Sequence, residues 1–149
     1  MRDINLIVVH CSATRVNQNF TVEQLEACHK ARGFDTIGYH YYITKDGTLY
    51  PCRPERIAGA HARHYNAHSI GICYEGGLDC KGQPKDTRTE WQKHSLRVLI
   101  LALLKDYPNC RICGHRDLSP DLNGNGEIEP EEWIKACPCF NAEKDWDKV

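Results

Sequence analysis

The sequence lacks the features that mark membrane, nucleic-acid-binding and exported proteins. Its longest apolar run, at about residues 96–104, is interrupted by Arg97 and is too short to span a bilayer. The N-terminal residues have neither an apolar core nor a small-residue cleavage site, so no signal peptide is expected. The formal net charge is −1, which predicts no nucleic-acid partner. We therefore expect synthesis in the cytoplasm, no membrane insertion, and access to an external substrate only after lysis or by non-classical export.

Internal repeats, low-complexity stretches and linkers are also absent, so the chain is expected to form one domain, residues 1–149, with its own core. Apolar residues make up 41% of the chain and charged residues 26%, as in ordinary globular proteins. There are nine cysteines, an odd number, and no signal that would take them to an oxidising compartment. Most of them are therefore expected to be small, reduced core residues.

Strand-like and helix-like segments alternate along the chain. Apolar and β-branched runs predict strands, Lys45-Asp46-Gly47 predicts a hairpin turn, and capping boxes at Thr21 and Thr89 begin helices. The expected elements are strands at 6–10, 39–44, 48–50, 69–74 and 110–114, helices at 21–32 and 89–107, and a loop at 58–68. This order predicts an α/β fold with a central mixed β-sheet flanked by helices.

Three residues that are far apart in the sequence could share one metal ion. His10 and His115 each follow a strand-like run, and Cys137 lies in the C-terminal segment. Two imidazoles and a thiolate are good zinc ligands and leave a fourth position for water, which is the arrangement of a catalytic zinc site. Cys113 and Cys139 compete with Cys137 as the third ligand.

A second arrangement uses cysteines alone. Cys110-x-x-Cys113 together with Cys137-x-Cys139 has the spacing of a closed structural zinc site. Strand alternation argues against it, because Cys110 and Cys113 would point to opposite faces of the sheet. The spacing alone leaves both arrangements open.

Seven short motifs follow one another along nearly the whole chain. They are VHCSAT at 9–14, GYHY at 38–41, GAHA at 59–62, YN at 65–66, SIGI at 69–72, GHRD at 114–117 and KACP at 135–138. In this order and spacing they closely resemble the bacteriophage lysozyme-type amidases. These belong to the zinc-dependent N-acetylmuramoyl-L-alanine amidase family, which is related to the peptidoglycan recognition proteins.

The resemblance implies a zinc site, a catalytic pair and a substrate groove on a mixed sheet with helices on both sides. The implied zinc ligands are His10, His115 and Cys137, the catalytic residues are Tyr39 and Lys135, and the groove residues are His61, Arg63, Asn66 and His68. The implied reaction is hydrolysis of the amide that joins muramic acid to L-alanine in peptidoglycan, and we expect a monomer. His68 departs from the pattern, since a phage member has a polar amide residue there.

Two other functions are compatible with parts of this sequence. Related recognition proteins that lack the cysteine ligand bind cell wall without cutting it. The presence of Cys137, Tyr39 and Lys135 favours an enzyme over such a binding protein. A cysteine-rich structural zinc protein is the third possibility, and metal stoichiometry would distinguish it.

An insertion between Asp117 and Lys135 matches a twelve-residue calcium-binding loop at 121–132. Oxygen-bearing side chains stand at loop positions one, three, five and twelve, a backbone carbonyl is available at seven, and Gly126 allows the sharp turn at six. The predicted calcium ligands are Asp121, Asn123, Asn125, Glu127 and Glu132. A short helix is expected from Pro130 to Ala136. The ion would order the segment that carries Lys135; the alternative is an Asn-Gly-rich turn without an ion.

Overall fold

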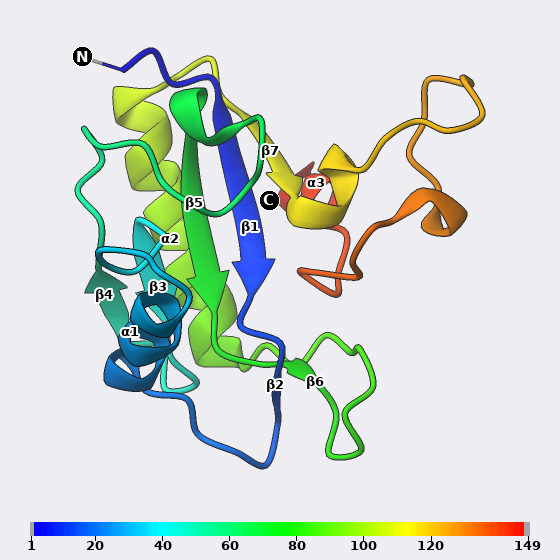
Figure 1. The fold of residues 1–149 in the computed structure, drawn as a ribbon. Helices are drawn as coiled ribbons and strands as arrows, with labels where there is room; N and C mark the ends of the chain where they lie inside the picture. The colour runs from blue at the N-terminus through cyan, green and yellow to red at the C-terminus, as the bar shows by residue number, and fades with distance from the viewer. Residues whose placement is uncertain (1, 148–149) are drawn as a thin grey trace.

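A five-stranded mixed β-sheet forms the centre of the computed structural model, which describes residues 2–147 (Figure 1). Its strands are β1 (Leu6–Cys11), β3 (Tyr41–Ile43), β4 (Leu49–Pro51), β5 (Ser69–Tyr74) and β7 (Arg111–Gly114). They lie in the order β4-β3-β5-β1-β7, and all neighbours are parallel except β3 and β4, which form the predicted hairpin. A separate parallel pair joins β2 (Thr14–Arg15) to β6 (Gly77–Leu78).

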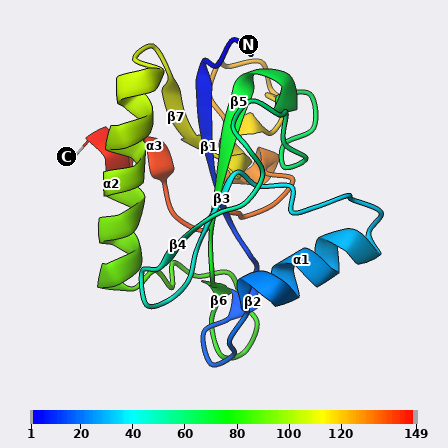
Figure 2. The same ribbon diagram turned by 90° about the vertical axis from the view of Figure 1, so that its left-hand side faces the viewer.

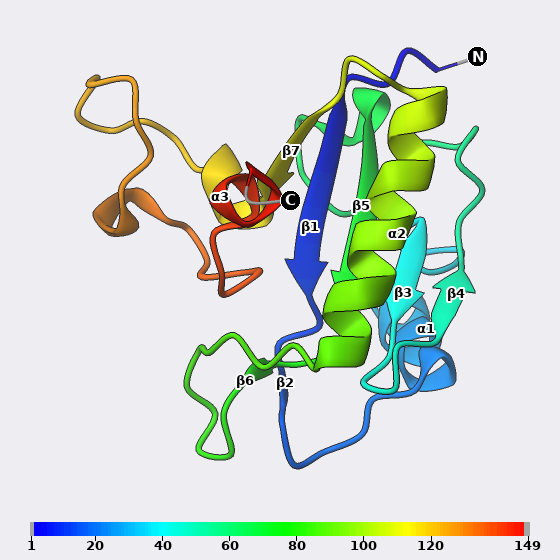
Figure 3. The same ribbon diagram turned by 180° about the vertical axis from the view of Figure 1, so that it is seen from behind.

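Helices cover both faces of this sheet. The helices are α1 (Val22–Ala31), α2 (Glu90–Asp106) and α3 (Ala142–Asp147). Figures 2 and 3 show α2 and α3 on one face and α1 on the other. Both predicted capping boxes are present, with the Thr21 and Thr89 side chains accepting from the backbone three residues on. The predicted α/β architecture is therefore confirmed.

Alternation along β1 decides which face carries the site. Ile7 and Val9 pack into the core beneath α2, whereas Leu6 and Val8 pack with Cys113 in a second cluster. His10 has the same parity as Leu6 and Val8, so its side chain belongs to the face opposite α2. This is the face that α1 and the long loops cover.

The segment between β7 and α3 differs from the sequence prediction. Two 3-10 helices occur there, η2 (His115–Leu118) and η3 (Pro130–Glu132), and the predicted helix from Pro130 to Ala136 is wrong. The helix ends at Trp133, whose backbone is extended and whose ring lies 4.0 Å from the Arg116 guanidinium. Tertiary contact with η2 therefore overrides the local helix signal. No helix in the described part of the chain is long and apolar enough to cross a membrane.

Candidate metal centre and active site

The carboxyl ends of β1 and β7 bring two histidines together. The two strands are parallel, and Val9 pairs with Gly114, so the residues that follow them, His10 and His115, stand side by side. Their ring centroids are 4.6 Å apart. Parallel pairing thus joins two residues that are more than a hundred positions apart in the sequence.

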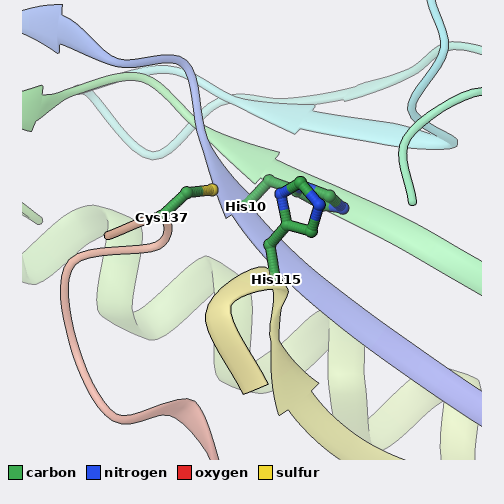
Figure 4. Close-up of side chains that lie close together, drawn as sticks. All are labelled: His10, His115 and Cys137. Carbon is green, nitrogen blue, oxygen red and sulfur yellow. The ribbon is translucent and has the colours of Figure 1, made fainter. Parts of the chain in front are cut away.

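Cys137 reaches the same place from the segment before α3 (Figure 4). Its carbonyl oxygen accepts a hydrogen bond from the Arg116 backbone N–H at 2.8 Å. The next carbonyl, that of Pro138, accepts from the buried Tyr74 hydroxyl at 2.6 Å. Gly114 allows this approach, because a Cβ there would lie 2.5 Å from the Pro138 ring. Two strands and η2 therefore fix the cysteine.

His10, His115 and Cys137 form the one group of three or more potential metal ligands found among residues 2–147, with ligand atoms within 4.8 Å of one another. The backbone N–H of Cys11 donates to the Cys137 sulfur at 3.1 Å, which helps to hold the sulfur beside the two histidines. Two imidazoles and a thiolate suit zinc and leave room for a fourth ligand. The donor set therefore fits the metal that the sequence predicts.

The four-cysteine arrangement does not form. Cys113 is buried in the cluster with Leu6 and Val8, whereas Cys110 packs against the core on the other side of the sheet. Cys139 instead lies near Cys11, with the two sulfurs 4.0 Å apart. This result agrees with the alternation argument made from the sequence.

Both histidines of the group are held neutral. His10 is 1% exposed, and burial lowers its pKa well below the ordinary value, with the charges of His61, His115 and Lys135 acting in the same direction. Burial also lowers the pKa of His115, again helped by Lys135. A neutral imidazole keeps a lone pair for a metal, so the site is ready for an ion near neutral pH.

The two predicted catalytic residues lie beside this group. The Tyr39 ring centroid is 5.0 Å from that of His10, and burial raises the pKa of the Tyr39 phenol, which keeps its proton. Lys135 is exposed, and its charge acts on both His10 and His115. The site thus combines a metal-ligand set and a protonated phenol, with the charge of Lys135 near enough to act on both histidines.

The four predicted groove residues have different surroundings. Arg63 is exposed, and His68 lies in η1 (Asn66–His68) with its ring 6.2 Å from that of Tyr65. The Asn66 side-chain oxygen accepts from the backbone N–H groups of His61 and Ala62, both at 2.9 Å. Asn66 therefore shapes the loop, and substrate contact by the four residues stays a prediction.

The side chain of His61 makes two contacts that could not be predicted from the sequence. Its Nδ1 lies 2.9 Å from Nε2 of His10, and its Nε2 lies 3.2 Å from the Ser69 hydroxyl. Ser69, the first residue of β5, was not among the predicted site residues. Neither contact follows from periodicity, because His61 lies in an irregular loop.

The predicted calcium loop closes on itself through its own polar groups. Asp121 accepts from the Gly124 and Gly126 backbone, at 3.0 and 2.7 Å. The carboxylate of Glu132, which is 6% exposed, accepts from the backbone of Leu122, of Asn123 at 3.2 Å and of Glu129 at 2.9 Å. Calcium binding by this loop stays a prediction.

The sheet order and the residues at its edge place the chain in the fold class of the peptidoglycan amidases and recognition proteins. Residues 1–132 match the family described as N-acetylmuramoyl-L-alanine amidase, and the chain belongs to this family. The matched region contains His10, Tyr39 and His115 but ends before Lys135 and Cys137.

Individual relatives agree with this assignment. The endolysin of Enterobacteria phage T3 is 39% identical over 142 residues, which cover 95% of this chain and 85% of the relative. The solved structure of the amidase LysC from Clostridium intestinale URNW is 32% identical with a TM-score of 0.73, and the match covers 99% of this chain and 85% of LysC. A variant of Drosophila PGRP-LB, solved in complex with tracheal cytotoxin, shares the fold at 21% identity, with a TM-score of 0.68 over 93% and 76% of the two chains.

Proposed function

We propose that the protein is a zinc-dependent hydrolase of the amide between N-acetylmuramic acid and L-alanine in peptidoglycan. The observation that carries the proposal is the convergence of His10, His115 and Cys137 from three separate segments. Membership of the amidase family supports the identity of the bond that is cut, and the two imidazoles and the thiol support zinc as the metal.

A zinc ion held by His10, His115 and Cys137 would polarise the amide carbonyl and lower the pKa of a bound water. The chain prepares this site in two ways. Burial keeps the two imidazoles neutral, and the Cys11 backbone N–H donates to the Cys137 sulfur and holds it at the site. The two imidazoles are therefore in the protonation state that zinc requires.

Tyr39 and Lys135 serve the reacting atoms. The Tyr39 phenol keeps its proton, so it is a hydrogen-bond donor that can orient water or give a proton to the departing amine. The Lys135 ammonium group supplies positive charge where the tetrahedral intermediate develops an oxyanion. Because Lys135 is two residues from Cys137, the segment that supplies the ligand also supplies this charge.

The proposal includes the place of action. The substrate is cell-wall peptidoglycan or its fragments, reached after lysis or by non-classical export, and the active form is a monomer. An endolysin among the relatives supports action on the wall.

The test is a digestion of purified peptidoglycan, with detection of new L-alanine amino termini. We expect these termini to accumulate, to stop on treatment with a zinc chelator, and to return when zinc is added back. Release that is indifferent to chelation would refute the metal. Binding to the wall without release would instead identify a binding protein.

A further inference from the structure

A chain of three polar side chains leads from the metal group into the sheet. Nε2 of His10 lies 2.9 Å from Nδ1 of His61, and Nε2 of His61 lies 3.2 Å from Oγ of Ser69. The two rings are perpendicular, at 89°, with centroids 4.9 Å apart. Ser69 is fully buried at the start of β5, so this series of hydrogen-bonded side chains ends inside the protein.

The His61 ring is fixed on several sides. Asn66 holds the backbone of the loop through the two hydrogen bonds described above. The ring lies directly over Gly71, where an added Cβ would be 2.6 Å from Cδ2 and Cγ and 2.8 Å from Nδ1. A Cβ at Gly59 would also come within 2.6 Å of the ring. The two glycines thus create the space that this imidazole fills.

Only one set of proton positions satisfies these hydrogen bonds and also leaves a lone pair of His10 free for a metal, and we expect the protein to hold this set before a metal binds. Nε2 of His10 faces His61, which leaves Nδ1 as the His10 atom available to the metal. A neutral His10 that offers the Nδ1 lone pair carries its proton on Nε2 and donates to His61 Nδ1. His61 then carries its own proton on Nε2, where the Ser69 oxygen accepts it.

We propose that His61 is a positioning residue for the metal site: it accepts the His10 Nε2 proton and so fixes the ring orientation and tautomer in which His10 binds zinc. Ser69 fixes the tautomer of His61 in turn. Partners of this kind orient metal-binding histidines and raise their basicity. This inference rests on the proposed function, since it assigns the zinc ligand whose orientation His61 controls.

His61 acts through His10 and is not itself a ligand. Its ligand atoms fall outside the group within 4.8 Å that His10, His115 and Cys137 form. Its nitrogens are also both engaged, one by His10 and one by Ser69.

The first test needs no metal. Nitrogen-15 NMR of the metal-free protein reports which nitrogen of each histidine carries the proton. We expect His10 and His61 both to be protonated on Nε2. A His61 protonated on Nδ1 would overturn the proposal, because that nitrogen could not then accept from His10.

The second test measures zinc affinity by competition with a chromophoric chelator. We expect His61→Ala to weaken zinc binding by about 10- to 100-fold. His61→Asn places an oxygen near the original Nδ1 position and should restore most of the affinity, whereas His61→Gln places its amide near Nε2 and should not. Equal affinity for all four proteins would overturn the proposal, and so would rescue by Gln in place of Asn.

Cobalt in place of zinc distinguishes a positioning role from direct ligation. We expect the wild-type protein and His61→Asn to give the same visible bands, because the ligand set is unchanged. A change of coordination number in His61→Asn would make His61 a ligand and overturn the proposal. Failure of the wild-type protein itself to bind one zinc would refute the proposed function, while the NMR test would still decide whether His61 orients His10.

Discussion

Replacing Gly71 by alanine should dislodge His61 from the metal site. The three atoms nearest to an added Cβ all belong to the His61 ring, at 2.6 to 2.8 Å, and ordinary contact begins at 3.4 Å. The ring cannot retreat without leaving His10, because it is hydrogen-bonded to His10 on one nitrogen and to Ser69 on the other. The methyl group and the His10–His61 hydrogen bond are therefore incompatible.

The expected cost follows from these contacts. Overpacking a filled site costs about 1–3 kcal/mol, and loss of one hydrogen bond about 0.5–1.5 kcal/mol. We expect Gly71→Ala to lower the free energy of unfolding by about 2–4 kcal/mol. For a chain of this size, that lowers Tm by roughly 5–15 °C. Zinc affinity should fall as well, because His10 loses its partner.

A double-mutant cycle isolates the cause. Denaturant unfolding of the metal-free protein is measured for wild type, Gly71→Ala, His61→Ala and the double variant. Without the His61 ring the new methyl group has room, so Gly71→Ala should cost less than about 0.5 kcal/mol in that background. An equal loss of stability in both backgrounds would refute the reasoning, since the damage would then lie in the β5 backbone.

Three further predictions concern catalysis, pH and calcium. Lys135→Ala should retain one zinc per chain and lose most turnover, measured as release of L-alanine amino termini; normal turnover would remove the lysine from the mechanism. Burial lowers the pKa of His61 to about 3 from an ordinary 6.5. Unfolding therefore takes up a proton below pH 6.5, and the free energy of unfolding decreases as the pH is lowered. In the metal-free protein, His61 should therefore lower the free energy of unfolding at pH 5 by about 2 kcal/mol relative to neutral pH. Thermal unfolding measures this loss, and the part due to His61 should be absent in His61→Ala. Calcium added after chelation should raise Tm in wild type but not in Asp121→Ala; an unchanged wild-type Tm would leave the 121–132 loop without an ion.

Local signals in the sequence predicted most of the regular structure. The Thr21 and Thr89 capping boxes begin helices because each threonine meets its partner within one turn. The apolar runs in β1 and β5 predicted strands because both strands are buried throughout. The pair β2–β6 was not predicted, since each strand has two residues and forms only by pairing across the fold.

The site could be predicted in part for a similar reason. His10 lies near the end of β1 and His115 directly follows β7, and parallel strands end at one edge, so their meeting follows from the topology. The path of the chain from Trp133 to Pro138 depends on long-range contacts with Arg116 and Tyr74, which no local pattern encodes. Among the candidate cysteines, Cys137 was predicted as the third ligand from the resemblance to amidases.

Metal content and turnover of two serine variants test the central claim most directly. Cys137→Ser replaces the proposed thiolate ligand, and Cys139→Ser is its matched control two residues away, next to Cys11 and outside the ligand group. We predict one tightly bound zinc and L-alanine release for wild type and for Cys139→Ser. Cys137→Ser should lose both. Full zinc content and turnover in Cys137→Ser, or their loss in Cys139→Ser alone, would contradict the assignment of the site.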